Sequence, residues 1–253
     1  MCKGRKTVLR KSLLLIALIA LALAASLSSA QEDTFNLTIL HTNDTHAGHE
    51  PQSNGNGGVA RQASVVAQVR AESDSVLLLD AGDRFSGTLF HTTYMGQDQV
   101  PIMNALRYDA MTLGNHEFDN GDQVLADFVA GLNFPVVVAN VDFNASDILS
   151  GKFVPSVVLD VNGQQVGVIG LVTADTVFSS SPGDELAFTD DYAGAANAAA
   201  ADLIAQGVNK IILLTHTGIN IDTSFIEQLE GVDVVIGGHS HTLLGNTYST
   251  ATQ

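Results

Sequence analysis

Residues 113–121 of the chain read LGNHEFDNG, and the leucine closes a short apolar run, Ala110–Leu113. A run of this kind predicts a buried strand, and the glycine and polar residues after it predict a loop. Only the pair Asn120-Gly121 is an ordinary turn signal. The side chains of Asn115, His116, Glu117 and Asp119 therefore gather where one strand ends, which raises the question of what else meets there.

Similar apolar runs recur along the chain and alternate with amphipathic stretches of helical length. The runs are Leu37–Leu40, Val76–Leu79, Ala110–Leu113, Pro135–Val138, Val166–Val172, Ile211–Leu214 and Val232–Ile236. The clearest helical stretches are Val59–Ala71, Val100–Arg107, Asp122–Leu132 and Ala193–Gln206. Short buried strands alternating with helices predict an α/β layered domain with largely parallel sheet, and Asn162-Gly163 indicates an antiparallel hairpin.

Metal-ligand residue types follow five of these strands. Besides Asn115, they are Asp44 and His46, Asp83, His216, and His239 with His241. Ligands bind at the carboxyl edge of parallel α/β sheets, so residues far apart in sequence can meet in one pocket there. Asp44 and His46, like His239 and His241, are two residues apart, which places both side chains on one face of an extended chain.

These seven residues predict a metal centre. Four imidazoles and three carboxylate or amide groups are too many for one tetrahedral ion, and they suit two ions that share a bridging carboxylate. Mixed nitrogen and oxygen ligands without thiolate favour Zn²⁺, Mn²⁺ or Fe over Mg²⁺ and Ca²⁺. Four residues with similar chemistry receive a structural interpretation instead, as hydrogen-bonding, packing or solvated groups: His41, His49, Asp80 and His91.

Together these motifs resemble the signature of the calcineurin-like metallophosphoesterases. The longer segments ILHTNDTH, GGVARQASVV, LLLDAGDRFSGT and MNALRYDAMTLGNHEFDNG are similar to the 5′-nucleotidase branch, both bacterial periplasmic and animal ecto-enzymes. The similarity extends over residues 35–245. It implies a layered sandwich of two mixed β-sheets flanked by helices.

The resemblance also implies a role for each site residue. One divalent metal ion, Zn²⁺ or Mn²⁺ by preference, would be held by Asp44, His46, Asp83 and His241. The second would be held by Asp83, Asn115, His216 and His239, with Asp83 bridging. His116 and Asp119 match the family's catalytic dyad. The implied reaction is release of phosphate from nucleoside 5′-monophosphates, by attack of a hydroxide held between the metals.

Several other activities use the same centre and stay open. They are 2′,3′-cyclic nucleotide phosphodiesterase, nucleotide-sugar hydrolase and thiosulfohydrolase activity. A non-catalytic, exported metal-binding fragment is the alternative from a different class. A pure binding module would have no need of His116 and Asp119 beyond seven ligands, which favours the enzyme.

The N-terminus has the layout of a secretory signal peptide. Five basic residues precede 13 apolar ones, Leu13–Ala25, and a small-residue segment follows to Ala30. The apolar run is shorter than the roughly 20 residues that a spanning helix needs, so we expect cleavage, with no membrane attachment afterwards. The expected location is periplasmic, cell-surface or extracellular. The lone Cys2 would be removed, which leaves no disulfide.

Charge and length complete the expectations. Removal of residues 1–30 leaves six basic and 27 acidic residues, a net charge of −21, which argues against nucleic acid as a partner. Residues 31–253 are expected to form a nearly complete metallophosphoesterase domain. The family's C-terminal domain, which recognises the nucleoside, is expected to be absent from this sequence, either because it is a fragment or because the protein is truncated.

Overall fold

The structure, a computed structural model, describes residues 34–245. Every element described below belongs to the unit that begins at Leu37. The predicted signal peptide, residues 1–30, lies outside the described residues.

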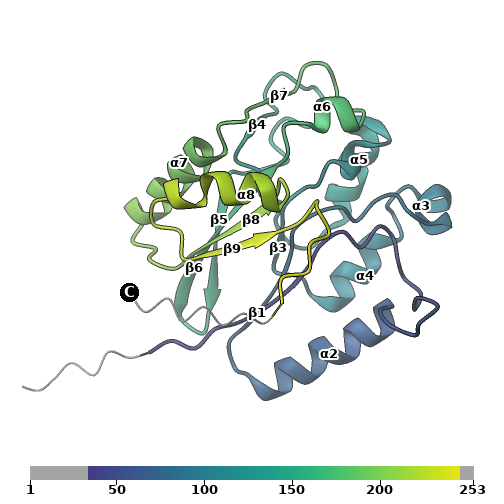
Figure 1. Ribbon diagram of the computed structural model, residues 1–253, viewed down its shortest axis with the longest axis horizontal. Coiled ribbons are helices and arrows are strands. Elements are labelled where there is room, and N and C mark those ends of the chain that lie inside the picture. Colours follow the sequence, from purple (N-terminus) through teal and green to yellow (C-terminus); the bar gives the residue numbers. More distant parts are fainter. Residues whose placement is uncertain (1–33, 246–253) are drawn as a thin grey trace, which may run out of the picture. The chain divides into compact units, whose positions relative to one another are not determined.

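Two main sheets form the centre of this unit (Figure 1). The first is parallel and has the order β1 (Thr38–Thr42), β2 (Val76–Asp80) and β3 (Ala110–Met111). The second is mixed and has the order β5 (Ser156–Val161), β6 (Gln164–Val172), β8 (Ile211–His216) and β9 (Val234–Gly237). A short antiparallel pair is made by β4 (Val141–Asp142) and β7 (Ala187–Phe188).

Helices cover both sheets through two hydrophobic clusters. The helices are α2 (Val59–Glu72), α3 (Leu89–Tyr94), α4 (Gln99–Leu106), η1 (His116–Phe118), α5 (Gly121–Gly131), α6 (Thr176–Ser179), α7 (Tyr192–Ala205), α8 (Ile219–Phe225) and η2 (Ile226–Gln228). One cluster joins β2 and β3 to α2, α4 and α5, through residues such as Leu78, Met103 and Leu125. The other joins β6 and β8 to α7 and α8, through residues such as Ile169, Leu203 and Phe225. These layers confirm the predicted α/β class.

Local sequence accounts for several element boundaries. Asn162 and Gly163 have φ values of 53° and 80°, as a type I′ turn requires, and they connect the predicted antiparallel hairpin of β5 and β6. The side chain of Asp191 caps α7 by accepting a hydrogen bond from the Gly194 amide at 3.0 Å. All four predicted helices are present within one residue of the expected ends.

The predicted strand Pro135–Val138 differs from expectation, because it makes isolated bridges and no ladder. The Val137 amide donates to the Met111 carbonyl at 2.8 Å, and the Val138 amide donates to the Val154 carbonyl at 2.8 Å. Successive donors therefore face different partners, and Pro135 has no amide hydrogen to extend a ladder. This segment joins β3 to the region that precedes β5.

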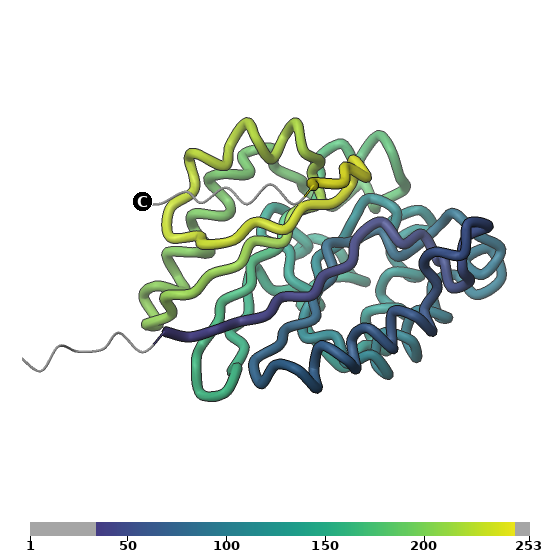
Figure 2. Tube along the Cα trace, turned by 60° about the horizontal axis from the view of Figure 1, so that its bottom comes forward, coloured from purple at the N-terminus to yellow at the C-terminus, as the bar shows by residue number. Residues whose placement is uncertain are grey.

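The two sheets deliver their strand ends to one place. Figure 2 shows β1, in purple, and β9, in yellow, running in the same direction. The loops that follow them meet, because the His239 amide donates to Asp44 Oδ1 at 3.0 Å. The fold thus places the loop after each of β1, β2, β3, β8 and β9 at a common edge.

Candidate metal centre

The structure brings together all seven residues that were predicted from the sequence. Three contacts join the strand ends. His216 Nε2 lies 3.0 Å from Asp83 Oδ2, His239 Nδ1 lies 3.0 Å from Asn115 Oδ1, and His239 N lies 3.0 Å from Asp44 Oδ1. The convergence of five strand ends is therefore confirmed as geometry.

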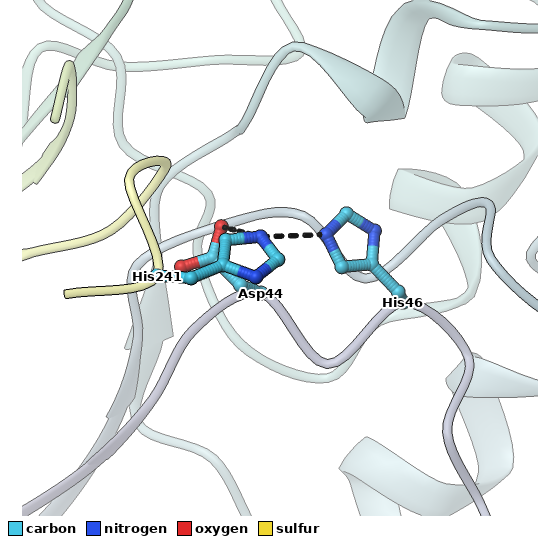
Figure 3. Close-up of side chains that lie close together, drawn as sticks. All are labelled: Asp44, His46 and His241. Carbon is cyan, nitrogen blue, oxygen red and sulfur yellow. Dashed lines mark hydrogen bonds and ion pairs between the residues drawn. The ribbon is translucent and has the colours of Figure 1, made fainter. Parts of the chain in front are cut away.

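One group of potential ligands consists of Asp44, His46 and His241, whose ligand atoms all lie within 4.8 Å of one another. Figure 3 shows the two imidazoles facing each other, with the carboxylate of Asp44 beside His241. His46 Nε2 is 3.2 Å from His241 Nε2, and the latter is 3.5 Å from Asp44 Oδ1. His241 is exposed at this rim, whereas the other two are partly buried.

A second group consists of Asp83, His216 and His239, and it is more deeply buried. Asp83 also approaches the first group, because its Oδ2 lies 3.9 Å from His46 Nε2. The carboxylate of Asp83 thus lies between the two groups, as a bridging ligand would. His46, Asp83 and His116 make a third, overlapping group.

Hydrogen bonds orient two of the imidazoles toward the centre. His46 Nδ1 donates to the Phe85 carbonyl at 3.1 Å, and His216 Nδ1 donates to the Ala81 carbonyl at 2.6 Å. When the imidazole is neutral, each bond places its proton on Nδ1 and leaves a lone pair on Nε2. His216 Nε2 is buried and, despite its short distance to Asp83, has no partner in hydrogen-bonding geometry. A buried, unsatisfied nitrogen aimed at a carboxylate fits a metal ligand.

The backbone of the centre is strained. Asp44, His46, Asp83, His239 and His241 have φ values of 49°, 46°, 59°, 74° and 51°. Residues other than glycine rarely adopt this left-handed region, and such strain clusters at functional sites. Five of the seven predicted ligands therefore sit in a conformation that the surrounding structure must enforce.

Electrostatics couple His216 to Asp83. Burial alone lowers the pKa of His216, but contact with the Asp83 carboxylate outweighs it and raises the pKa to about 9. Burial alone raises the pKa of Asp83, but hydrogen bonds from His216 and the His116 amide outweigh burial, so the pKa is lowered and Asp83 is ionised. In the absence of metal, a proton on His216 thus neutralises part of the charge that a cation would balance.

His116 and Asp119 form a pair at the edge of the centre. His116 Nδ1 donates to Asp119 Oδ2 at 2.7 Å, and the other carboxylate oxygen accepts from Ser180 Oγ at 2.7 Å. Ser86 Oγ donates to Oδ2 as well. The hydrogen bond with Asp119 raises the pKa of His116. The ring of His116 meets that of His46 edge to face, with centroids 5.1 Å apart.

Two buried residues support the centre without having been predicted as site residues. Glu117 is completely buried, and burial raises its pKa to about 7, with the nearby charge of Asp83 adding to the shift. Arg84 is buried beside Asp80, with Nη1 3.1 Å from Asp80 Oδ2, and its guanidinium lies over the ring of Tyr108. The one sequence signal that could have identified both is a charged residue close to a predicted ligand, since Glu117 is two positions from Asn115 and Arg84 is next to Asp83.

Three of the four residues given a structural interpretation, Asp80, His91 and His49, behave accordingly. Asp80 accepts a hydrogen bond from the Gly82 amide at 3.0 Å and so supports the loop that carries Asp83. His91 is buried against the ring of Phe85 and contacts Asn120 Oδ1 at 2.7 Å. His49 packs on Phe90 and pairs with Asp98, and His41 is an exposed residue of β1.

Known proteins are similar to this chain in sequence and fold. The model of the calcineurin-like phosphoesterase family matches residues 37–243. The 5′-nucleotidase of Diplobatis ommata is 42% identical over 239 residues, which make up 90% of this chain and 41% of that protein. The solved 5′-nucleotidase precursor of Thermus thermophilus has 48% identity and a TM-score of 0.80, over 83% of this chain and 43% of its own.

A third similar protein is an NAD nucleotidase. The structure of the Haemophilus influenzae NAD nucleotidase has 38% identity and a TM-score of 0.75, over 83% of this chain and 39% of its own. The chain thus spans about two fifths of the length of these relatives.

Within residues 34–245, none of the helices combines the length and apolar character that a membrane crossing requires. The family match establishes that the chain belongs to the calcineurin-like phosphoesterases, a family that binds two divalent metal ions.

Proposed function

We propose that this chain is the metal-binding part of a phosphohydrolase that releases phosphate from nucleoside 5′-monophosphates. The observation that carries the proposal is the position of Asp83 between two groups of potential ligands, beside the pair His116 and Asp119. The similarity to proteins named 5′-nucleotidase supports the choice of substrate.

The donor set supports two divalent ions. Asp44, His46, Asp83 and His241 would hold one ion, and Asp83, Asn115, His216 and His239 the other. Mixed imidazole and oxygen donors without thiolate favour Zn²⁺ or Mn²⁺ over Mg²⁺ and Ca²⁺. When bound, such a pair of ions activates water and offsets the negative charge of a phosphoryl group.

His116 would act on the substrate from outside the ligand set. Its Nδ1 is occupied by Asp119, so Nε2 is the nitrogen that can donate a proton or hydrogen bond to a phosphate oxygen. The carboxylate of Asp119 fixes the orientation of the ring and favours its protonated form. Ser180 in turn holds Asp119 through a hydroxyl donor.

The matched domain supplies the metal centre, and recognition of the nucleoside is assigned by comparison with the longer relatives. The matched span, residues 37–243, supports the proposal that residues 31–253 carry the metallophosphoesterase domain. This chain spans 41% of the D. ommata 5′-nucleotidase and 43% of the T. thermophilus chain, so we assign selection of the base to the remaining portion of such proteins. The basic and apolar pattern of residues 1–30 supports export to the periplasm, cell surface or medium.

Phosphate release from AMP and from p-nitrophenyl phosphate tests the proposal, with Zn²⁺ or Mn²⁺ supplied. Hydrolysis of both esters would support a complete site. Hydrolysis of the small ester alone would support a working centre that lacks its nucleoside site. If neither ester reacts while elemental analysis finds two ions per chain, the non-catalytic, metal-binding alternative replaces the proposal.

A second candidate is hydrolysis of the pyrophosphate bond in a dinucleotide. The similarity to the H. influenzae NAD nucleotidase favours it. Incubation with NAD, followed by chromatography for AMP and nicotinamide mononucleotide, separates the two. If AMP and nicotinamide mononucleotide form from NAD and persist, hydrolysis of the dinucleotide is favoured. If NAD is not cleaved and AMP releases inorganic phosphate, the first candidate is favoured.

A further inference from the structure

The carboxylate of Glu117 is buried beside the proposed centre, and the proposed chemistry does not use it. Its side chain is 0% exposed. It accepts hydrogen bonds from four backbone amides. A buried carboxylate is stable only when such donors replace water.

The four donors come from two different loops. Oε2 accepts from Asp83 N at 3.0 Å and from Gly114 N at 2.6 Å, so it joins the loop after β2 to the loop after β3. Oε1 accepts from Arg84 N at 2.7 Å and from Phe85 N at 3.2 Å, both in the first loop. One side chain therefore connects the loop of Asp83 to the loop of Asn115.

These loops need such a connection because they approach very closely. A Cβ atom on Gly82 would lie 2.4 Å from Gly114 N, and one on Gly114 would lie 2.6 Å from Asp83 N. Only glycine permits this contact. Asp83 is also held in the left-handed region, with φ of 59°. Without acceptors, the crowded amides of Asp83 and Gly114 would be buried and unsatisfied.

We propose that Glu117 is a positioning residue that fixes the loops of Asp83 and Asn115 before any metal binds, and thereby fixes the distance between the two metal sites. This inference rests on the proposed metal centre and does not depend on the substrate. Further contact between the loops supports it, since the His116 amide donates to Asp83 Oδ1 at 3.0 Å.

The Glu117→Gln variant tests the inference because glutamine has nearly the same shape but one acceptor oxygen. If that oxygen faces Asp83 and Gly114, its NH₂ group opposes the amides of Arg84 and Phe85. In the other orientation, the connection between the loops is lost. The matched control is Asp109→Asn. The carboxylate of Asp109 also accepts from a backbone amide, that of Leu78 at 2.7 Å, but Asp109 precedes β3, whereas the loop of Gly114 follows β3.

Calorimetric titration with Zn²⁺ measures the effect. Loss of an outer partner of a metal ligand weakens metal affinity about 10–100-fold, and we expect a loss of this size for Glu117→Gln. Asp109→Asn should bind Zn²⁺ as the wild type does, even where its melting temperature falls. Wild-type affinity at both sites in Glu117→Gln, with only a lower melting temperature, would overturn the inference.

Hydrogen exchange on the wild type decides the question even if Glu117→Gln does not fold. We expect the amides of Asp83, Arg84, Phe85 and Gly114 to be protected already in the metal-free protein, as NMR would show. Protection that appears only after Zn²⁺ is added would mean that the metal orders the loops, and the inference would be wrong. Neither readout requires turnover, so inactivity toward AMP would refute the proposed function and leave this inference standing.

Discussion

His116 Nδ1 donates to Asp119 Oδ2 at 2.7 Å, and the two residues lie at the start of η1 and directly after its end, beside the ring of His46. This arrangement separates two tasks within one loop. Asn115 faces the buried group of ligands, since its Oδ1 contacts His239, while the ring of His116 lies beside that of His46 at the edge of the centre. Substitution of each residue should therefore have a distinct effect.

Replacement of His116 by alanine should slow phosphate release by about 10²–10⁴-fold, because a positioned proton donor contributes a factor of this size. Metal content should stay at two ions per chain, as measured by elemental analysis. Loss of the metals together with the activity would show that His116 is a ligand, as its place in the third group of potential ligands would allow.

Replacement of Asp119 by asparagine should change the pH dependence. The carboxylate of Asp119 raises the pKa of His116, so its removal lowers that pKa and the ring loses its proton at lower pH. The basic limb of the kcat profile should therefore shift toward lower pH. An unshifted limb would mean that another group controls it. Ser180→Ala, which removes one donor to Asp119 and keeps the carboxylate, should shift it less.

Asp83 and Asp44 should differ in their effect on metal content. Asp83 contacts both groups of ligands, so Asp83→Ala should leave fewer than one ion per chain. Asp44 belongs to one group, so Asp44→Ala should retain the other ion. Elemental analysis after dialysis measures both. Equal metal content in the two variants would contradict a bridging role for Asp83.

Arg84 should contribute to stability through its buried ion pair with Asp80. Arg84→Met leaves Asp80 buried and without its cation, and breaking one partner of a buried pair costs about 3–5 kcal/mol. Urea denaturation of the metal-free protein measures this cost. The exposed Arg61, whose guanidinium donates to the Gly57 carbonyl just before its own helix, provides the control Arg61→Met, with little expected change.

Removal of metal should lower the melting temperature. Binding to the native state alone stabilises a protein by about 4 kcal/mol when the free ion is at 1,000 times its dissociation constant. EDTA should remove this stabilisation from the wild type and leave Asp83→Ala unaffected. A chelator effect of equal size in that variant would point to a metal site elsewhere in the chain.

The elements of the fold could be predicted largely from local patterns. The apolar runs at Val76–Leu79 and Ile211–Leu214 became β2 and β8, and the amphipathic stretch at Val59–Ala71 became α2. Buried strands and amphipathic helices follow from the period of their side chains, which neighbouring residues define. The Pro135–Val138 run was the exception, because its partners alternate between distant segments and no local signal encodes that.

The meeting of these residues could also be predicted, since each lies at the carboxyl end of a strand or in the loop after it, and parallel strands end at one edge. The sequence by itself thus determined the α/β layers, the seven residues that meet and the family to which the chain belongs. It did so because residue types and their spacing along each strand are local properties.

Tertiary structure alone decided how these residues are held. Glu117 accepts from amides more than 30 positions earlier. Asp83 lies between two groups that each combine residues from both sheets, and His216 points Nε2 inward because Nδ1 binds the Ala81 carbonyl. Each of these relationships depends on distances between loops of separate strands. Such distances arise only when the sheets pack together and exclude water, which obliges every buried donor and acceptor to find a partner.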